Sequence, residues 1–335
     1  EYDLVRKMRA SVLILGPLLA RKKEASVSLP GGCAIGARPI DIHIDALKKL
    51  GAEFVLDSGY VNCKAPKGLK GNKIDLKKIS VGASENIIMA ASLASGESEI
   101  NNIAIEPEVI DLIKCLKSMG SEIDFIGDRK ILIQGKENLR GTTHEVIPDR
   151  IEAGTYMIAG ALIGNNLKIQ NIEPDHMQNI LNVFEELKID FKLNKDSISI
   201  SKSDIEVGVN LQTEEYPGFP TDLQAQIMVL LSKSKKNSSI IENIFENRFM
   251  HVPELNRMGT QISIEGNKSI ISPSSELIGA PVMATDLRAS VSLVLAGLIS
   301  KGETIINRIY HIDRGYENIE KKFRMLGADI HREKE

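Results

Sequence analysis

Residues 285–300 read Thr-Asp-Leu-Arg-Ala-Ser-Val-Ser-Leu-Val-Leu-Ala-Gly-Leu-Ile-Ser, a polar start followed by an apolar run of helical length. A helix that is apolar on nearly every side must be buried on nearly every side. The same arrangement recurs in four other places, where a short polar segment precedes apolar runs at 11–20, 86–95, 154–164 and 225–232. A buried helix that recurs indicates a fold built from repeated units.

Each of these helices is followed by a short apolar stretch and then by an amphipathic helix. The amphipathic helix usually stops at a glycine, which supplies a left-handed cap: Gly51, Gly120, Gly259 and Gly327. The third unit departs from this pattern with Lys188. Alternating apolar residues at 123–133, 191–200 and 262–271 surround turn residues and predict antiparallel hairpins. The predicted order of elements in each repeated unit is therefore helix, strand, helix, strand, strand.

The predicted fold class is α/β, a two-domain inside-out barrel with helices within and sheets outside. The half-apolar strands are suited to cover the buried helices, whereas a parallel βαβ fold, the alternative, would bury its strands. Three units per domain would make six, but five are visible, and the chain opens at Glu1 without a methionine. We therefore expect the N-terminal part to be missing. The expected domains are 1–147 and 148–335.

Composition limits the function. The core must be aliphatic, because 42% of the 335 residues are hydrophobic but only 4% are aromatic. A net charge of −3 argues against a general nucleic-acid binder. The three cysteines form no C-x-x-C pair, which favours neither a zinc site nor a disulfide framework and fits a cytoplasmic protein. No apolar run is long enough to span a bilayer, and no signal peptide is present.

Residues 30–39, Pro-Gly-Gly-Cys-Ala-Ile-Gly-Ala-Arg-Pro, form the most informative stretch for chemistry. Glycine and proline end regular structure, so this segment is predicted to be a loop. Its thiol, Cys33, lies five residues before the fixed cation Arg38, in a setting that favours an exposed and reactive cysteine. The alternative is an inert buried cysteine.

Arginines stand at or beside the junctions between units: Arg9, Arg38, Arg248, Arg288 and Arg314. Arginine grips carboxylate and phosphate in a bidentate manner, so converging junction arginines would form a cleft for a small polyanion. The alternative is a set of solvated surface charges.

Asp222 and Asp286 each follow a threonine and precede an apolar helix, and Asp149 recurs at the same place. An aspartate there is suited to cap the helix, which is the plainer interpretation. A carboxylate in a cleft would instead serve as a general base. The segment 78–82, Lys-Ile-Ser-Val-Gly, also opens a helix, where either an anion site or an ordinary cap is expected. No metal-ligand spacing or nucleotide phosphate loop appears, and no cofactor is predicted.

Five strings in order, at 29–39, 219–226, 246–254, 284–290 and 311–316, give the chain a specific likeness along its whole length. On these residues it resembles the UDP-N-acetylglucosamine 1-carboxyvinyltransferases, enolpyruvyl transferases of the first committed step of peptidoglycan synthesis. The resemblance implies a two-domain inside-out α/β barrel with sixfold pseudo-repetition. It also implies transfer of the enolpyruvyl group of phosphoenolpyruvate to the 3-hydroxyl of the sugar nucleotide, with release of phosphate.

The resemblance assigns roles to individual residues. Cys33 is similar to the cysteine that acts as general acid, forms an adduct with phosphoenolpyruvate and is the target of fosfomycin, whereas Asp222 is similar to the carboxylate that takes the hydroxyl proton. The implied arginines around phosphate and substrates are Arg9, Arg38 and Arg314, with Arg248, Asp286 and Arg288 as further members of the cleft. The implied nucleotide-binding residues are Arg38, Pro39, Ile40, Asp41, Ile42, Lys78, Ile79, Ser80 and Val81, with Ile244 against the sugar nucleotide.

The expected partners are the two small-molecule substrates, with no nucleic acid and no membrane, and the expected state is a cytoplasmic monomer. The family also carries a Lys-Asn pair in an N-terminal region that we expect to be missing here, so the fragment is expected to fold imperfectly or to be inactive. Two alternatives stay open. One is 5-enolpyruvylshikimate-3-phosphate synthase, against which the Cys33 loop and the string at 38–42 argue. The other is a non-catalytic sugar-nucleotide binder.

Overall fold

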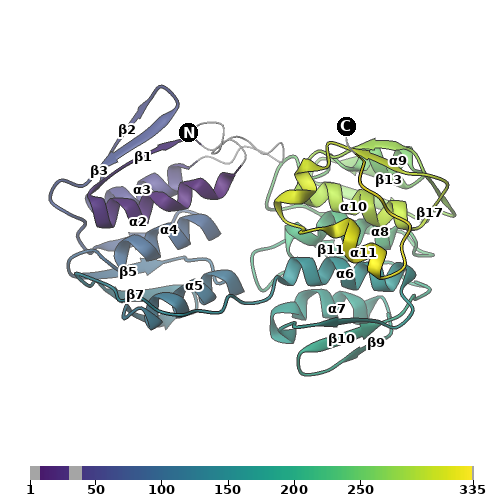
Figure 1. The fold of residues 1–335 in the computed structure, drawn as a ribbon, viewed down its shortest axis with the longest axis horizontal. Coiled ribbons are helices and arrows are strands. Elements are labelled where there is room, and N and C mark those ends of the chain that lie inside the picture. Colours follow the sequence, from purple (N-terminus) through teal and green to yellow (C-terminus); the bar gives the residue numbers. More distant parts are fainter. Residues whose placement is uncertain (1–7, 30–39, 334–335) are drawn as a thin grey trace. The chain divides into compact units, whose positions relative to one another are not determined.

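The computed structural model describes residues 8–29 and 40–333, with only the backbone of Arg9. The described residues fall into two compact units that divide between Ile147 and Pro148. Each unit has its own continuous apolar core. Each is therefore treated by itself below (Figure 1).

The first unit contains two repeats of the expected element order. Its helical segments are the 3₁₀ helix η1 (Arg9–Ile14), α2 (Leu15–Lys22), α3 (Asp41–Lys49), α4 (Val81–Ala91) and α5 (Pro107–Ser118). Its strands are β1 (Glu24–Ser28), β2 (Glu53–Asp57), β3 (Tyr60–Lys64), β4 (Lys73–Asp75), β5 (Glu97–Asn101), β6 (Glu122–Gly127) and β7 (Lys130–Gln134). They form two sheets, ordered β1-β3-β2 and β4-β5-β7-β6. Within this unit, helices α2, α3 and α4 lie between the two sheets (Figure 1).

The second unit contains three repeats. Its helical segments are α6 (Arg150–Ile163), η2 (Pro174–Met177), α7 (Gln178–Glu186), η3 (Thr221–Leu223), α8 (Gln224–Leu231), α9 (Val252–Arg257), α10 (Leu287–Leu298), η4 (Ile309–Arg314) and α11 (Ile319–Met325). Its strands are β8 (Leu167–Gln170), β9 (Phe191–Leu193), β10 (Ser197–Ile200), β11 (Asn210–Gln212), β12 (Ser238–Ile241), β13 (Gln261–Glu265), β14 (Lys268–Ser272), β15 (Leu277–Ile278), β16 (Pro281–Met283), β17 (Ser300–Lys301) and β18 (Ile305–Asn307). The larger sheets are ordered β8-β10-β9 and β11-β12-β14-β13.

The buried helices confirm the inside-out arrangement. All eight residues of α8 are buried, as are the eight residues 289–296 of α10. The strands beside them alternate, so that β14 buries Ser269 and Ile271 and leaves its other residues partly exposed. Apolar helices therefore form the core and the sheets cover them, as the apolar runs predicted.

The three predicted hairpins are present, with antiparallel pairing of β6 with β7, β9 with β10 and β13 with β14. A further strand, which was not predicted from the sequence, lies in front of several buried helices. Strands β4 and β11 each pair in parallel with the strand that follows the helix, β5 and β12 respectively. These extra strands have three residues each, which is too short for an alternating pattern to be recognised.

The helix ends follow the glycine pattern. The four predicted caps have positive φ angles: Gly51 95°, Gly120 101°, Gly259 101° and Gly327 94°. Lys188 takes the same left-handed place with φ 57°. The third repeat along the chain therefore keeps the cap geometry with a lysine in place of glycine, the residue that adopts it most easily.

The last repeat has a smaller sheet region than the others. There β15 pairs in parallel with β17, and β16 with β18, in two-stranded sheets. Large apolar side chains of this repeat are exposed, including Ile278 at 61% and Met325 at 83%.

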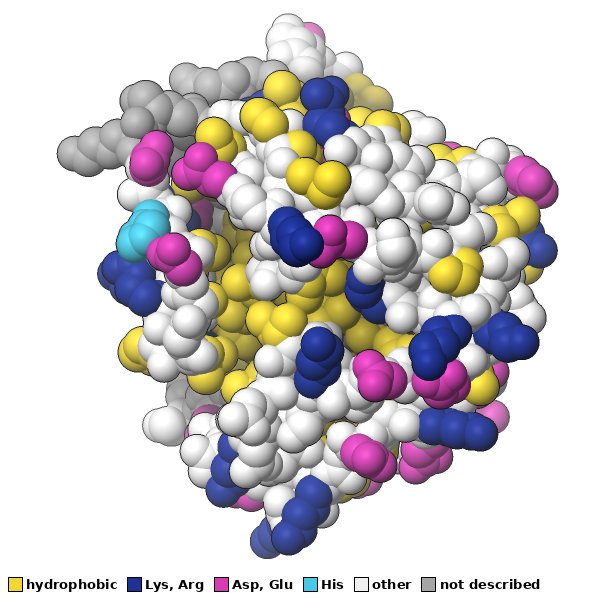
Figure 2. All heavy atoms as spheres, turned by 90° about the vertical axis from the view of Figure 1, so that its right-hand side faces the viewer, with side chains coloured by type: hydrophobic (Ala, Val, Ile, Leu, Met, Phe, Trp, Pro, Cys, Tyr) yellow, Lys and Arg dark blue, Asp and Glu magenta, His cyan; other side chains and the backbone are white. Residues whose placement is uncertain are grey.

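Figure 2 shows one face of the molecule, where apolar side chains gather in a hollow between charged ones. Among the described residues, no helix is both long and apolar enough to cross a membrane.

Candidate functional site

The three candidate aspartates of the second unit do different things. Asp149 caps α6 by accepting hydrogen bonds from the backbone amides of Ile151 and Glu152. Asp286 caps α10 in the same manner, accepting from Arg288 and Ala289. For these two residues the capping interpretation is confirmed.

The capping interpretation is wrong for Asp222. It lies inside η3, whose N-cap is Pro220, and no side-chain cap bond is present. Its carboxylate instead accepts a hydrogen bond from a guanidinium nitrogen of Arg248 at 2.8 Å and another from Nε of Arg288 at 3.3 Å. The structure therefore brings together three residues that the sequence analysis placed in the cleft.

The exposure of this cluster is uneven. The side chain of Asp222 is 40% exposed, whereas those of Arg248 and Arg288 are 4% and 12% exposed. Two nearly buried cations therefore hold a carboxylate at the surface of the unit. Buried guanidinium groups need an anion nearby, and a charged ligand placed here would meet both of them.

Two opposing effects determine the pKa of the Asp222 carboxyl, namely its desolvation and the charges of nearby arginines. Desolvation would raise the pKa of this carboxyl, but the positive charges of Arg288 and Arg248 outweigh it and hold the pKa below its ordinary value. Arg150, at the start of α6, acts in the same direction. In this arrangement Asp222 is ionised at neutral pH and is a weak base.

A buried polar network, which no sequence pattern predicted, lies beside the cluster. The hydroxyl groups of Tyr316 and Thr155 are 2.8 Å apart, and Nε2 of Gln226 lies 3.3 Å from each. The same amide nitrogen donates to the backbone carbonyl of Asp222 at 2.8 Å. Arg288 stacks over the ring of Tyr316, with 5.4 Å between its guanidinium carbon and the ring centroid. These contacts hold both Asp222 and Arg288 in place.

Glu242 connects the loop of Ile244 to the site and was also missed. One carboxylate oxygen accepts hydrogen bonds from the backbone amides of Ile244 and Phe245, at 2.9 and 3.1 Å. The other accepts from the hydroxyl of Thr221, the neighbour of Asp222, at 2.9 Å. Glu242 is 3% exposed. It therefore sets the position of the Ile244 loop relative to the ion pair.

His251 is a further buried group near the two arginine-bearing elements. Desolvation lowers its pKa to about 4, the charge of Arg248 lowers it too, and that of Asp286 opposes the change. The imidazole is therefore neutral at physiological pH. None of the sequence patterns singled this histidine out.

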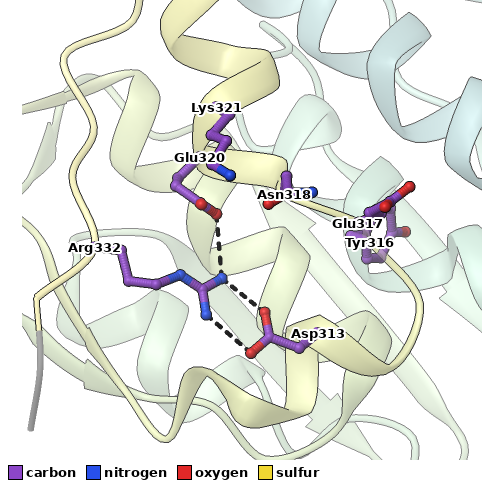
Figure 3. Close-up of a pocket in the computed structure, with 7 residues that line it drawn as sticks. All are labelled: Asp313, Tyr316, Glu317, Asn318, Glu320, Lys321 and Arg332. Atoms are coloured by element: carbon purple, nitrogen blue, oxygen red, sulfur yellow. Dashed lines mark hydrogen bonds and ion pairs between the residues drawn. The ribbon is translucent and has the colours of Figure 1, made fainter.

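Arg314 is exposed at the end of η4. The residue before it, Asp313, forms two hydrogen bonds with the guanidinium of Arg332, at 2.9 and 2.7 Å, and Glu320 accepts a third at 3.1 Å (Figure 3). Arg332 thus ties the segment after α11 to the end of η4. That contact fixes the backbone from which Arg314 projects.

The candidate nucleotide segments of the first unit lie at the starts of two helices. Ile40 is the N-cap residue of α3, with Asp41 and Ile42 in its first turn. Ser80 caps α4 by accepting from the amide of Ala83 at 3.3 Å, so the capping interpretation of that segment holds. Lys78 and Val81 are exposed on either side of this cap.

These two helix starts are connected. Lys77 and Asp45 form an ion pair of 2.5 Å between the segment in front of α4 and the body of α3. Several sequence-predicted site residues lie outside the described residues, namely Cys33, Arg38 and Pro39, as does the side chain of Arg9. Their assignments stay predictions.

Comparison with known proteins identifies relatives of the chain. Residues 1–323 match the family model of EPSP synthase (3-phosphoshikimate 1-carboxyvinyltransferase). UDP-N-acetylglucosamine 1-carboxyvinyltransferase of Gluconacetobacter diazotrophicus is 53% identical over 334 residues, which cover 100% of this chain and 80% of the relative. The protein of the same name from Pelagibacter ubique is 54% identical over 331 residues, covering 99% and 79%.

Solved structures confirm the fold class. The enolpyruvyl transferase NikO from Streptomyces tendae matches with a TM-score of 0.90 at 25% identity, over 99% of this chain and 79% of that one. EPSP synthase from Acinetobacter baumannii matches with a TM-score of 0.71 at 17% identity, over 95% and 77%, and supports the fold alone.

Proposed function

The chain belongs to the EPSP synthase family, and from that premise we propose that it transfers the enolpyruvyl group of phosphoenolpyruvate to the 3-hydroxyl of UDP-N-acetylglucosamine. It is a transferase of peptidoglycan synthesis. The observation that carries the proposal on the structural side is the carboxylate of Asp222 held between two nearly buried arginines. Such a cluster offers both a base and a grip for a small polyanion.

The proposed reaction has two half-reactions. In the first, the sugar oxygen bonds to C2 of phosphoenolpyruvate, its proton goes to Asp222, and a general acid protonates the methylene carbon. In the second, the bond between C2 and the phosphate oxygen breaks, phosphate leaves, and the methyl carbon loses a proton. The acid and the base must be separate groups, and Cys33 is proposed as the acid.

The low pKa of Asp222 fits a base that is activated by its substrate. While Arg248 and Arg288 face the carboxylate alone, their charges keep it ionised and weakly basic. A bound carboxylate or phosphate shares those two cations and so lessens their effect on Asp222. Its pKa then rises, and it accepts the hydroxyl proton more readily.

The remaining assignments belong to the same proposal. Arg9, Arg38 and Arg314 bind phosphate and carboxylate groups, and the segments 40–42 and 78–81 hold the nucleotide with Ile244 against the sugar. Fosfomycin modifies Cys33, and phosphoenolpyruvate forms an adduct there. We propose that the protein acts in the cytoplasm as a monomer and that its product supports cell-wall growth, cell shape and division.

Phosphate release under steady-state conditions tests the proposal. The full-length protein is expected to release phosphate with UDP-N-acetylglucosamine as acceptor and not with shikimate 3-phosphate. Asp222→Asn should lower kcat by about 10³-fold, because the amide takes no proton at neutral pH. Asp124→Asn, a matched change at an exposed aspartate of β6, should leave kcat unchanged. Turnover with shikimate 3-phosphate alone, or full activity of Asp222→Asn, would refute the assignment.

A further inference from the structure

The helical run at the start of the first unit changes from a 3₁₀ helix, η1, to an α-helix, α2, between Ile14 and Leu15. An unbroken α-helix would join the amide of Gly16 to the carbonyl of Val12. Here the side chain of Asn86, on α4, stands between them. Its Oδ1 accepts from the Gly16 amide at 2.6 Å, and its Nδ2 donates to the Val12 carbonyl at 2.9 Å. The side chain of Asn86 is thus inserted into the i→i−4 hydrogen-bond ladder at the point where the helix type changes.

The side chain of Asn86 is tightly packed against Gly16. Asn86 is fully buried, and α4 packs directly against η1 and α2. A Cβ atom at Gly16 would come within 2.4 Å of both the backbone oxygen and Oδ1 of Asn86. Glycine at position 16 is therefore what lets the carboxamide enter the helix.

The remaining hydrogen of the amide reaches a third element. Nδ2 of Asn86 lies 3.1 Å from Nδ1 of His43, in the first turn of α3. The Gly16 amide can only donate and the Val12 carbonyl can only accept, so the orientation of the carboxamide is fixed. His43 must then accept at Nδ1, which assigns it the neutral tautomer protonated on Nε2.

This junction joins the three segments to which the substrate-binding residues of the unit were assigned. Arg9 is the first residue of η1, Ile40–Ile42 form the start of α3 beside His43, and Ser80 and Val81 form the start of α4. The starts of α3 and α4 also touch, because a Cβ atom at Gly82 would lie 3.2 Å from the His43 ring. One side chain thus sets the mutual placement of all three.

We propose that Asn86, with His43 as its partner, is a positioning residue for the sugar nucleotide. It acts through η1, α3 and α4 rather than by touching the substrate, and the inference rests on the proposed function for what those segments bind. Loss of the junction leaves the segments folded and misaligned, so the nucleotide binds more weakly. Asp222 and its two arginines lie in the other unit, so the chemical step is largely kept.

Two measurements on Asn86→Ala and Asn86→Asp test this. The aspartate keeps the acceptor for Gly16 and loses both donors. Each variant should raise the KM for UDP-N-acetylglucosamine about tenfold and change kcat less than threefold. The control is Ser92→Ala, which removes the buried bond to Ser121 at the far end of the same helix. It should lower the melting temperature and leave the KM unchanged.

Hydrogen exchange supplies a readout that does not depend on activity. Exchange in Asn86→Ala should become faster at the Gly16 amide and at residues 40–44, and should not change there in Ser92→Ala. Asn86→Ser, which keeps one donor and one acceptor, replaces the alanine variant if that one does not fold. An unchanged KM together with unchanged exchange would overturn the inference. Absence of turnover in the unmodified protein would instead refute the proposed function, and exchange would still decide the role of Asn86.

Discussion

Glu85, one turn beyond the cap of α4, makes the stability of the first unit depend on pH in an unusual direction. The side chain is partly buried, and the neighbouring carboxyl groups of Glu106 and Glu108 face it. Desolvation, together with the charges of Glu108 and Glu106, raises its pKa from 4.5 to about 7. The folded state therefore prefers the protonated acid.

The direction and size of this pH dependence follow from the linkage between proton binding and folding stability. Between the unfolded pKa of 4.5 and the folded value of about 7, the folded state binds more protons than the unfolded one, so stability falls as pH rises. Each unit of pKa corresponds to about 1.4 kcal/mol, so the loss approaches ~3 kcal/mol above pH 7. Glu85→Gln is neutral at every pH and removes this loss. The variant should be more stable than the unmodified protein at pH 8, and close to it at pH 4.5.

Urea denaturation at several pH values between 4.5 and 8 measures the effect. The free energy of unfolding of Glu85→Gln minus that of the unmodified protein should grow from pH 4.5 to about pH 7 and level off above it. Glu97→Gln, an exposed glutamate on β5 of the same unit, is the control and should follow the unmodified protein. Parallel curves for Glu85→Gln and the unmodified protein would show that the carboxyl is not held in its neutral form, and the reasoning would fail.

Two further predictions concern the second unit. Lys188→Gly should raise the free energy of unfolding by ~1 kcal/mol, because glycine adopts the left-handed cap at φ 57° without strain; a lower melting temperature would contradict this. Arg332→Ala should cost ~1 kcal/mol at neutral pH, as expected for a bidentate pair near the surface. Its hydrogen bonds lower the pKa of Asp313, so this difference should vanish in denaturation curves as pH falls below 3.8 and through the lower folded value.

Much of the fold was predictable because it depends on local, repeated patterns. Apolar runs of helical length identified the buried helices, and glycines at their expected places marked the ends of the amphipathic ones. The three-residue strands β4 and β11 were not predictable, since their pairing is set by the strand that returns beside them and not by their own residues. The polar network of Thr155, Gln226 and Tyr316 was hidden for a related reason, because its members are 71 to 161 residues apart.

The tripeptide Thr-Asp-Leu shows where local reasoning ends, because it occurs at 221–223 and at 285–287 with different outcomes. At the second place the aspartate has an extended backbone and its carboxylate caps the helix that follows. At the first, Pro220 starts a 3₁₀ turn, so Asp222 lies inside the turn and its carboxylate does not cap the helix. Arg248 and Arg288, which are 26 and 66 residues further along the chain, donate hydrogen bonds to that carboxylate. A capping residue becomes a candidate base through one shift in where the helix begins, and only the folded chain decides which.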